Sequence, residues 1–135
     1  MTAFRDAPEF GTFTVLNALQ LRLIDCSADA DVRTVARKMA EHNVHCVIVR
    51  GTEPHDWGIV SDLDLMAALR PELSGATAGQ LAATDSLVVD PTDSLEHAAQ
   101  LMAEHQTTHA VVVDPVTSRP IGILSTLDVA RFLAG

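Results

Sequence analysis

Apolar residues follow a helical spacing in two segments of the chain. The first set is Val32, Val35, Ala36, Met39 and Ala40, and the second set is Leu95, Ala98, Ala99, Met102 and Ala103. Both sets occupy positions i, i+3, i+4, i+7 and i+8, which predicts two amphipathic helices of equal length. We expect Asp29 or Asp31 to cap the first helix. We expect Thr92 or Asp93 to cap the second, with Glu96 three residues after Asp93 as in a capping box.

Short runs of β-branched and aliphatic residues surround each helix and predict strands. One run precedes each helix and two follow it, separated by a polar stretch rich in turn formers, as is typical of a β-hairpin. The expected strands are 23–25, 47–49 and 57–60 in the first half and 86–89, 111–113 and 121–124 in the second. Each half ends with a further helix, at 62–69 and at 126–133.

The two halves also share sequence, which indicates an internal repeat. Residues 39–42 recur as residues 102–105, at an offset of 63, and residues 58–65 recur as residues 122–129, at an offset of 64. The difference implies one inserted residue between these blocks. We expect the insertion around His45 and Cys46 in the first half, opposite 108–110 in the second.

These patterns predict an α/β (α+β) fold made of two βαββα units. One unit alone is too short to bury both faces of its sheet, so we expect the two units to pack about a pseudo-two-fold axis as one globular domain. The expected organisation is an N-terminal arm (1–12), a first motif (13–70), a linker rich in Pro, Ser and Gly (71–79) and a second motif (80–135).

Composition and charge narrow the classes of function. Of the 135 residues, 47% are apolar and only 4% are aromatic, so we expect an aliphatic core. The net charge of −9 repels phosphate backbones and anionic lipid, so we expect no nucleic-acid or membrane partner. No apolar run approaches membrane-spanning length, and the first 14 residues lack a signal-peptide pattern. The two cysteines, Cys26 and Cys46, form no disulfide framework, which fits a cytoplasmic protein.

A short motif marks the end of both predicted hairpins. It reads Gly-h-h-Ser-x-x-Asp, where h is apolar, and it spans Gly58 to Asp64 and again Gly122 to Asp128. Two copies at the same place in a βαββα repeat resemble the CBS motif, named after cystathionine β-synthase, in a tandem pair also called a Bateman module. The resemblance runs from about Val15 to Gly135, which suggests a stand-alone CBS domain-containing protein.

The resemblance implies a regulatory module and no enzyme. CBS pairs bind adenosine-containing molecules such as AMP, ADP, ATP, S-adenosylmethionine or NAD in clefts between the two motifs. They usually form homodimers whose conformation carries the signal. For this chain the resemblance implies such a ligand, no required cofactor, a homodimer and an unknown regulated protein in trans. The alternative is a ligand-free structural or protein-interaction module.

Each cleft would centre on the Ser and Asp of one motif. A carboxylate accepts hydrogen bonds from both vicinal hydroxyls of a ribose, and a serine hydroxyl adds a third bond. By resemblance, the first cleft contains Ser61 and Asp64, with an adenine slot from Thr84, Ser86, Leu87, His109, Ala110 and Val111. The second contains Ser125 and Asp128, with a slot from Leu21, Leu23, Ile24, His45, Cys46 and Val47. The same Ser and Asp residues also fit a purely structural role as helix caps.

The sequence departs from the family where phosphate would bind. Many CBS motifs carry an arginine directly before the Asp, but Leu63 and Leu127 stand there in this chain. The remaining candidates for a phosphate contact are His45, His109, Arg119 and Arg131. Because neutral histidine binds anions weakly, we expect AMP, an adenosyl compound or no ligand rather than a highly charged nucleotide.

Metal binding and catalysis are the other classes to consider. His42 with His45, and His105 with His109, have spacings that could suit a metal, but apart from Cys46 no carboxylate or cysteine completes a set of ligands. We therefore expect no metal site. No nucleophile motif is present, and caps and ribose binding account for the acidic and hydroxyl residues, so we expect no catalytic residues.

Overall fold

The structure is a computed structural model, which describes residues 12–19, 23–73 and 75–135. These residues form two compact units. The first-sheet unit comprises residues 22–86 together with 116–120. The second-sheet unit comprises residues 12–19, 87–115 and 121–135. Among the described residues, no helix is both long and apolar enough to cross a bilayer.

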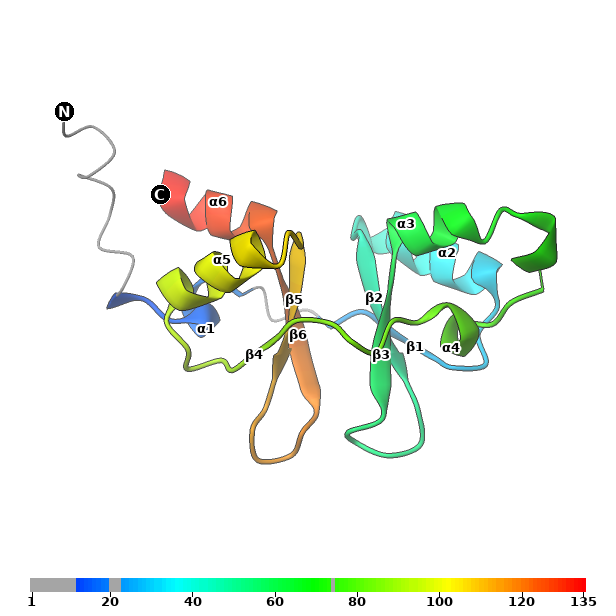
Figure 1. The fold of residues 1–135 in the computed structure, drawn as a ribbon, viewed down its shortest axis with the longest axis horizontal. Coiled ribbons are helices and arrows are strands. Elements are labelled where there is room, and N and C mark those ends of the chain that lie inside the picture. Colours follow the sequence, from blue (N-terminus) through cyan, green and yellow to red (C-terminus); the bar gives the residue numbers. More distant parts are fainter. Residues whose placement is uncertain (1–11, 20–22, 74) are drawn as a thin grey trace. The chain divides into compact units, whose positions relative to one another are not determined.

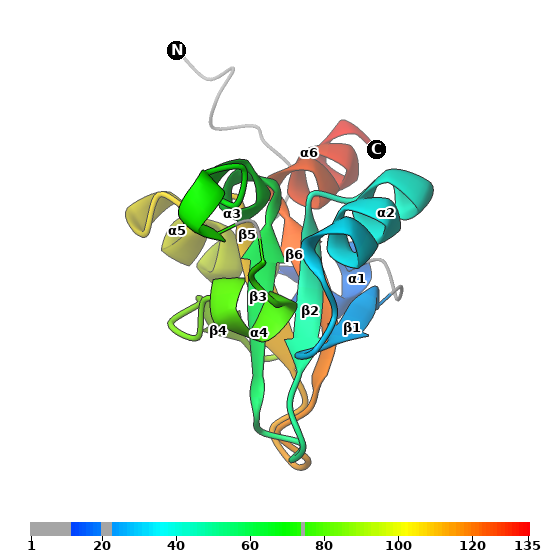
Figure 2. The same ribbon diagram turned by 90° about the vertical axis from the view of Figure 1, so that its right-hand side faces the viewer.

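The first-sheet unit is a three-stranded sheet covered by helices. Strand β1 (Asp25–Ser27) runs parallel to β2 (Cys46–Arg50), which pairs antiparallel with β3 (Trp57–Ser61). Its helices are α2 (Val32–His42), α3 (Asp62–Ala67) and α4 (Ala78–Leu81), and a 3-10 turn, η2 (Pro71–Leu73), follows α3. In Figures 1 and 2, the loop joining β2 and β3 points away from α2 and α3.

The second-sheet unit repeats this plan. Strand β4 (Val88–Val89) runs parallel to β5 (His109–Val113), and β6 (Pro120–Ser125) lies on the other side of β5. Its helices are α1 (Val15–Ala18), α5 (Leu95–Glu104) and α6 (Thr126–Ala134). The predicted α+β fold with two strand-and-helix repeats is therefore confirmed.

Each unit has its own aliphatic core, built from the positions that the helical spacing predicts. In the first-sheet unit, Val35 and Met39 of α2 pack on Val47 and Val60 of the hairpin. In the second-sheet unit, Leu95 and Met102 of α5 are buried in a cluster with Val112 and Leu124 of the strands. The alternation along β2 and β3 places Val47, Val49 and Val60 on one face of the first sheet, toward α2.

The helix caps agree with the sequence for α2 but not for α5. Asp31 caps α2, with its carboxylate accepting a hydrogen bond of 2.7 Å from the Thr34 N–H. Ser94, rather than Thr92 or Asp93, caps α5 and accepts from the His97 N–H. Thr92 and Asp93 are engaged in a turn with Asp90 instead, so the helix begins one residue later than a cap at Asp93 predicts and two residues later than a cap at Thr92 predicts.

The inserted residue lies in the hairpin, not around His45 and Cys46. In the parallel strand pairs, the Ile48 N–H donates to the Ile24 carbonyl, and the equivalent Val111 N–H donates to the Leu87 carbonyl. Donors and acceptors both differ by 63 residues between the two units. At the far end of each hairpin, the Asp62 N–H donates to the His45 carbonyl, and the equivalent Thr126 N–H donates to the Thr108 carbonyl. Here the donors differ by 64 residues between the units, while the acceptors differ by 63. The extra residue therefore falls between β5 and the motif glycine, where β6 has six residues and β3 has five.

Two short helices pack on the sheet of the motif that they do not belong to in sequence. Helix α1 lies at the start of the expected first motif (13–70) but packs on α5 and α6, with Val15 and Leu19 buried in the second-sheet core. Helix α4 spans the end of the expected linker (71–79) and the start of the expected second motif, but packs on β1, β2 and β3. Ala83, after this helix, forms two hydrogen bonds with Ile59. Neither helix was predicted. Thr77 to Gln80 carries the capping-box pattern that could have revealed α4 within the expected linker.

Two predicted strands have other bounds in the structure, and some predicted residues lie outside the part of the chain that it describes. Strand β1 begins at Asp25, two residues after the expected start, and β4 is confined to Val88 and Val89. Residues 1–11 of the expected arm, and Leu21 of the expected adenine slot, lie outside the described residues.

Candidate ligand site

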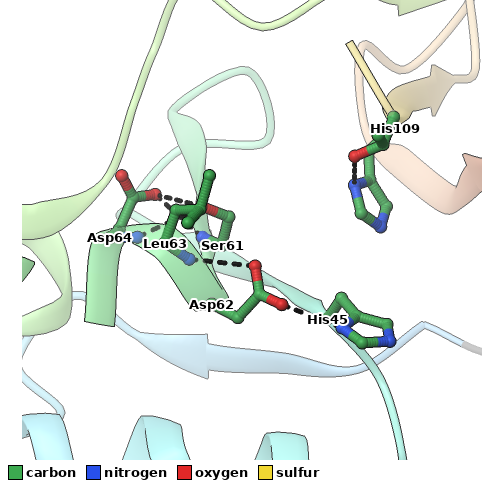
Figure 3. A network of polar contacts seen from close by, with 7 residues as sticks. His45, Ser61, Asp62, Leu63, Asp64 and His109 are labelled. Atoms are coloured by element: carbon green, nitrogen blue, oxygen red, sulfur yellow. Dashed lines mark hydrogen bonds and ion pairs between the residues drawn. The ribbon is translucent and has the colours of Figure 1, made fainter. Parts of the chain in front are cut away.

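The Ser61–Asp64 pair stands where β3 turns into α3. Ser61 is the N-cap, and the Asp64 N–H donates to its Oγ at 3.3 Å. In return, Asp64 Oδ2 accepts from the Ser61 N–H at 2.8 Å and from the Ser61 hydroxyl at 3.0 Å (Figure 3). This is a complete capping box, so the fold alone justifies both residues. The other oxygen, Asp64 Oδ1, accepts no hydrogen bond from any described residue.

The Ser125–Asp128 pair repeats this geometry between β6 and α6. The Asp128 N–H donates to Ser125 Oγ at 3.1 Å, and Asp128 Oδ2 accepts from the Ser125 N–H at 2.9 Å. Asp128 is the more deeply buried of the two aspartates, with only 9% of its surface exposed. Its Oδ1 lies 4.0 Å from Arg131 Nη1, a distance that makes an ion pair but no direct hydrogen bond.

The two sites carry different polar neighbours. Beside Asp64, the exposed Asp62 carboxylate contacts His45 Nδ1 at 2.8 Å (Figure 3), and its other oxygen accepts from the Leu63 N–H. At the matching place in the second-sheet unit, Thr108 takes the position of His45, and its hydroxyl contacts His109 Nδ1. An additional carboxylate therefore lies beside Asp64 that has no counterpart beside Asp128, where Thr126 replaces Asp62.

Cys46 lies directly opposite Ser61 in the β2–β3 pairing and is buried. Burial, together with the negative charges of Asp64 and Asp62, raises the pKa of its thiol to about 12. Cys46 is therefore an inert, neutral side chain at neutral pH rather than a reactive thiol.

The predicted slot residues divide between the two units. Ile24, Thr84 and Ser86 belong to the first-sheet unit, as do Leu23, His45, Cys46 and Val47, whereas Leu87, His109, Ala110 and Val111 belong to the second-sheet unit. His45 and Cys46 lie next to Ser61 and Asp62 within their unit. Their assignment to the Asp128 cleft, and the assignment of His109 to Val111 to the Asp64 cleft, stay predictions.

Some of these slot groups are already used by the fold. The carbonyls of Ile24 and Leu87 accept from Ile48 and Val111 in the parallel pairs, so they have one lone pair left for a ligand. Ser86 differs, because its hydroxyl oxygen is buried without a hydrogen-bond partner among the residues that the structure describes. Buried polar atoms are rarely left unpaired, which makes Ser86 a candidate for contact with a ligand or a water molecule.

A hollow of about 370 Å³ opens beside Asp128 within the second-sheet unit. Helices α1 and α6 line it, with Asn17, Ala18, Asp128, Arg131, Phe132 and Gly135. The carbonyl oxygen of the Asn17 amide is taken by the backbone and hydroxyl of Thr14, so its NH₂ group is the part available to a ligand. Asn17 and Phe132 were not predicted as site residues, because the packing of α1 on α6 is not encoded in any local pattern.

Metal ligands do not gather in the part of the chain that the structure describes. No group of three His, Cys, Asp or Glu side chains there is arranged to hold an ion. Of the histidines considered from the sequence, His45 is paired with Asp62, and His105 Nδ1 contacts the Leu101 carbonyl at the end of α5.

A repeated strand–helix–hairpin–helix unit with a Ser–Asp capping box at each hairpin end defines the class of protein. The CBS domain family model matches residues 22–71 and 78–135, and the chain belongs to this family. Among curated proteins, it is similar to Hypoxic response protein 1 of Mycobacterium tuberculosis. The two are 29% identical over 116 residues, which cover 82% of this chain and 78% of that protein.

Solved structures of CBS pairs share the fold. CBSX2 of Arabidopsis thaliana in complex with AMP has a TM-score of 0.76 at 28% identity, over 90% of this chain and 96% of that chain. Hypoxic Response Protein I with two coordinated zinc ions has a TM-score of 0.73 at 26% identity, over 87% and 97%. The CBS domain pair of protein MJ0100, in complex with 5′-methylthioadenosine and S-adenosyl-L-methionine, has a TM-score of 0.81 at 20% identity, over 90% and 96%.

Proposed function

We propose that this chain is a regulatory module that binds an adenosine-containing ligand through Asp64 and Asp128. One feature of the capping boxes carries the proposal. Each aspartate commits Oδ2 to the backbone N–H of its own serine, while Oδ1 accepts no hydrogen bond from any described residue. A carboxylate fixed in this way is held rigid by the fold and presents its second oxygen to the hydroxyls of a ribose.

Two further observations support the proposal. CBSX2, which is 28% identical to this chain, was solved with AMP bound. In addition, the unpaired Ser86 hydroxyl belongs to the segment expected to form an adenine slot, and a purine edge would supply the missing hydrogen bond.

We also propose that the chain acts as a homodimer that regulates another protein in trans. The helices that follow the two capping boxes expose large apolar side chains. These are Leu63, Met66 and Leu69 in and after α3, and Leu127 and Leu133 in α6. Such residues on one helix favour an interface. A ligand that binds one dimer geometry more tightly than another would shift the population between them.

The alternative is an interaction module that binds no ligand. It is favoured by the completeness of both capping boxes, which need no ligand to justify Ser61, Asp64, Ser125 or Asp128. The arginine that would precede each aspartate in many CBS motifs is also replaced by leucine.

Thermal unfolding of the full chain with AMP, ADP, ATP, S-adenosylmethionine and NAD distinguishes a ligand-binding regulatory module from an interaction module that binds no ligand. A ligand at about 100 times its Kd stabilises the native state by about 2.7 kcal/mol, which is a visible rise in Tm. Asp64→Ala and Asp128→Ala should each remove one site, and the double variant should show no shift.

Matched controls separate ligand binding from capping. Asp31→Ala removes the cap of α2 in the unit that contains Asp64, and Ser94→Ala removes the cap of α5 in the unit that contains Asp128. Each control should lower Tm about as much as the matching Asp64→Ala or Asp128→Ala change does, since each removes hydrogen bonding at one helix N-cap, but it should leave the ligand-induced rise in Tm intact. Full ligand shifts in the Asp64→Ala, Asp128→Ala double variant would refute the ribose role.

A further inference from the structure

The two aspartate sites differ in charge at equivalent positions of the repeat. Counting at the offset of 64 that relates Asp64 to Asp128, Arg131 corresponds to Ala67, and Thr126 corresponds to Asp62. The Asp128 site therefore pairs one carboxylate with one guanidinium. The Asp64 site has two carboxylates and no arginine at the matching place.

Arg131 is positioned to act on a ligand held by Asp128. Its Nη1 lies 4.0 Å from Asp128 Oδ1, the oxygen that the cap leaves open, and both residues line the hollow of about 370 Å³. The Asp128 side chain is about 10% exposed while that of Arg131 is 59% exposed, so the carboxylate is fixed and the guanidinium is free to turn. The Asn17 amide adds a neutral donor to the same hollow.

We propose that the Asp128 site selects an adenosine compound bearing a phosphate, with Arg131 as the phosphate-binding residue, whereas the Asp64 site disfavours phosphate. The inference rests on the proposed function, because it requires that Asp128 holds the ribose. The hydroxyls would bind Asp128 Oδ1, and the phosphate would accept two N–H bonds from the planar guanidinium. At the other site, a phosphate would face Asp62 and Asp64 with no arginine to offset the repulsion.

Calorimetric titrations of the full chain with AMP and with adenosine test this at low salt. Asp64→Ala leaves only the Asp128 site, and Asp128→Ala leaves only the Asp64 site. In Asp64→Ala, we expect AMP to bind more tightly than adenosine. In Asp128→Ala, we expect AMP to bind no more tightly than adenosine. Adding Arg131→Ala to Asp64→Ala should weaken AMP binding about 10- to 100-fold and leave adenosine binding unchanged, since charged hydrogen bonds of this kind are worth about 1.5–3 kcal/mol.

The repeat also provides a gain-of-function variant. Ala67 is exposed, so Asp62→Thr with Ala67→Arg should bring the AMP preference to the Asp64 site in the Asp128→Ala background. If adenosine binds but the ratio of AMP to adenosine affinity is the same with and without Arg131, the phosphate role is wrong while the ribose role stands. If adenosine binds neither single-site variant, the ribose role fails and the phosphate role fails with it.

Discussion

Replacing Gly58 by alanine should destabilise the chain more than the same change at its repeat partner, Gly122. A Cβ at Gly58 would lie 2.8 Å from the carbonyl oxygen of Ala83 and 3.1 Å from the Ala82 Cβ. The first of these contacts is with backbone, and it is closer than real Cβ atoms come. At Gly122 the nearest atoms are instead the methyl groups of Leu19, at 3.0 and 3.1 Å.

The size of the effect follows from what must move. Ala83 and Ile59 exchange two backbone hydrogen bonds, of 3.0 and 2.8 Å, which hold the segment after α4 against β3. Displacing Ala83 weakens both bonds, at about 0.5–1.5 kcal/mol each, so we expect Gly58→Ala to cost about 2–3 kcal/mol. Leu19 can adjust its rotamer, so Gly122→Ala should cost about 1 kcal/mol.

Thermal and urea unfolding measure the difference. For a cooperative unit of this length, about 2–3 kcal/mol corresponds to a fall in Tm of about 7–10 °C. Gly75→Ala is the control, because a Cβ there meets no atom of the described residues within 4 Å. The unfolding free energy of this variant should differ from that of the unchanged chain by less than about 0.5 kcal/mol. Equal costs at Gly58 and Gly122, or a larger one at Gly122, would show that the contact with Ala83 does not fix α4 to the sheet.

Two further outcomes follow from the titrating groups. Cys26 and Cys46 are buried, and burial raises the pKa of both thiols, to about 12 for Cys46. At pH 8 only about one Cys46 thiol in 10⁴ is ionised, so the native chain should react slowly with a disulfide reagent and the denatured chain should titrate two thiols; rapid native reaction would contradict the burial. Hydrogen bonds from the Thr34 and Thr92 N–H groups lower the pKa of Asp31 and Asp90, so their stabilisation is present above pH 4 and is lost as the pH falls through the folded-state pKa. Asp31→Asn and Asp90→Asn should each reduce the fall in Tm between pH 5 and pH 3, and an unchanged fall would show that these bonds contribute nothing.

Local sequence patterns were enough to predict the elements that repeat. The spacing of Val35 and Met39 predicted α2, and the β-branched run around Ile48 predicted β2, because both patterns reflect burial against a core within the same motif. The Ser–Asp pairs were predicted as caps and as ligand contacts from one motif, and the capping role is confirmed.

What the sequence could not predict depends on contacts between distant segments. The packing of α1 against α6 brings Asn17 beside Asp128, and nothing near Asn17 in the sequence indicates this. The start of β1 at Asp25 is set by its register with Ile48. The place of the insertion was wrong for the same reason, because identical residues on either side of a hairpin do not reveal which turn absorbs the extra residue.

The exchanged positions of α1 and α4 bear on the order in which the chain can fold during synthesis. The main segment of the first-sheet unit, residues 22–86, is contiguous, and it includes the α4 helix that completes its core. The second-sheet unit instead joins some of the earliest described residues to the last ones. Leu95 donates to the Phe13 carbonyl, and the Phe13 ring packs edge-on against Phe132 at 4.7 Å. On the ribosome, the segment around Phe13 must therefore wait, with its apolar side chains unshielded, until α6 has left the exit tunnel. The segment around Phe13, rather than the first-sheet unit, is therefore the part of the chain that stays open to chaperones and proteases until α6 is made.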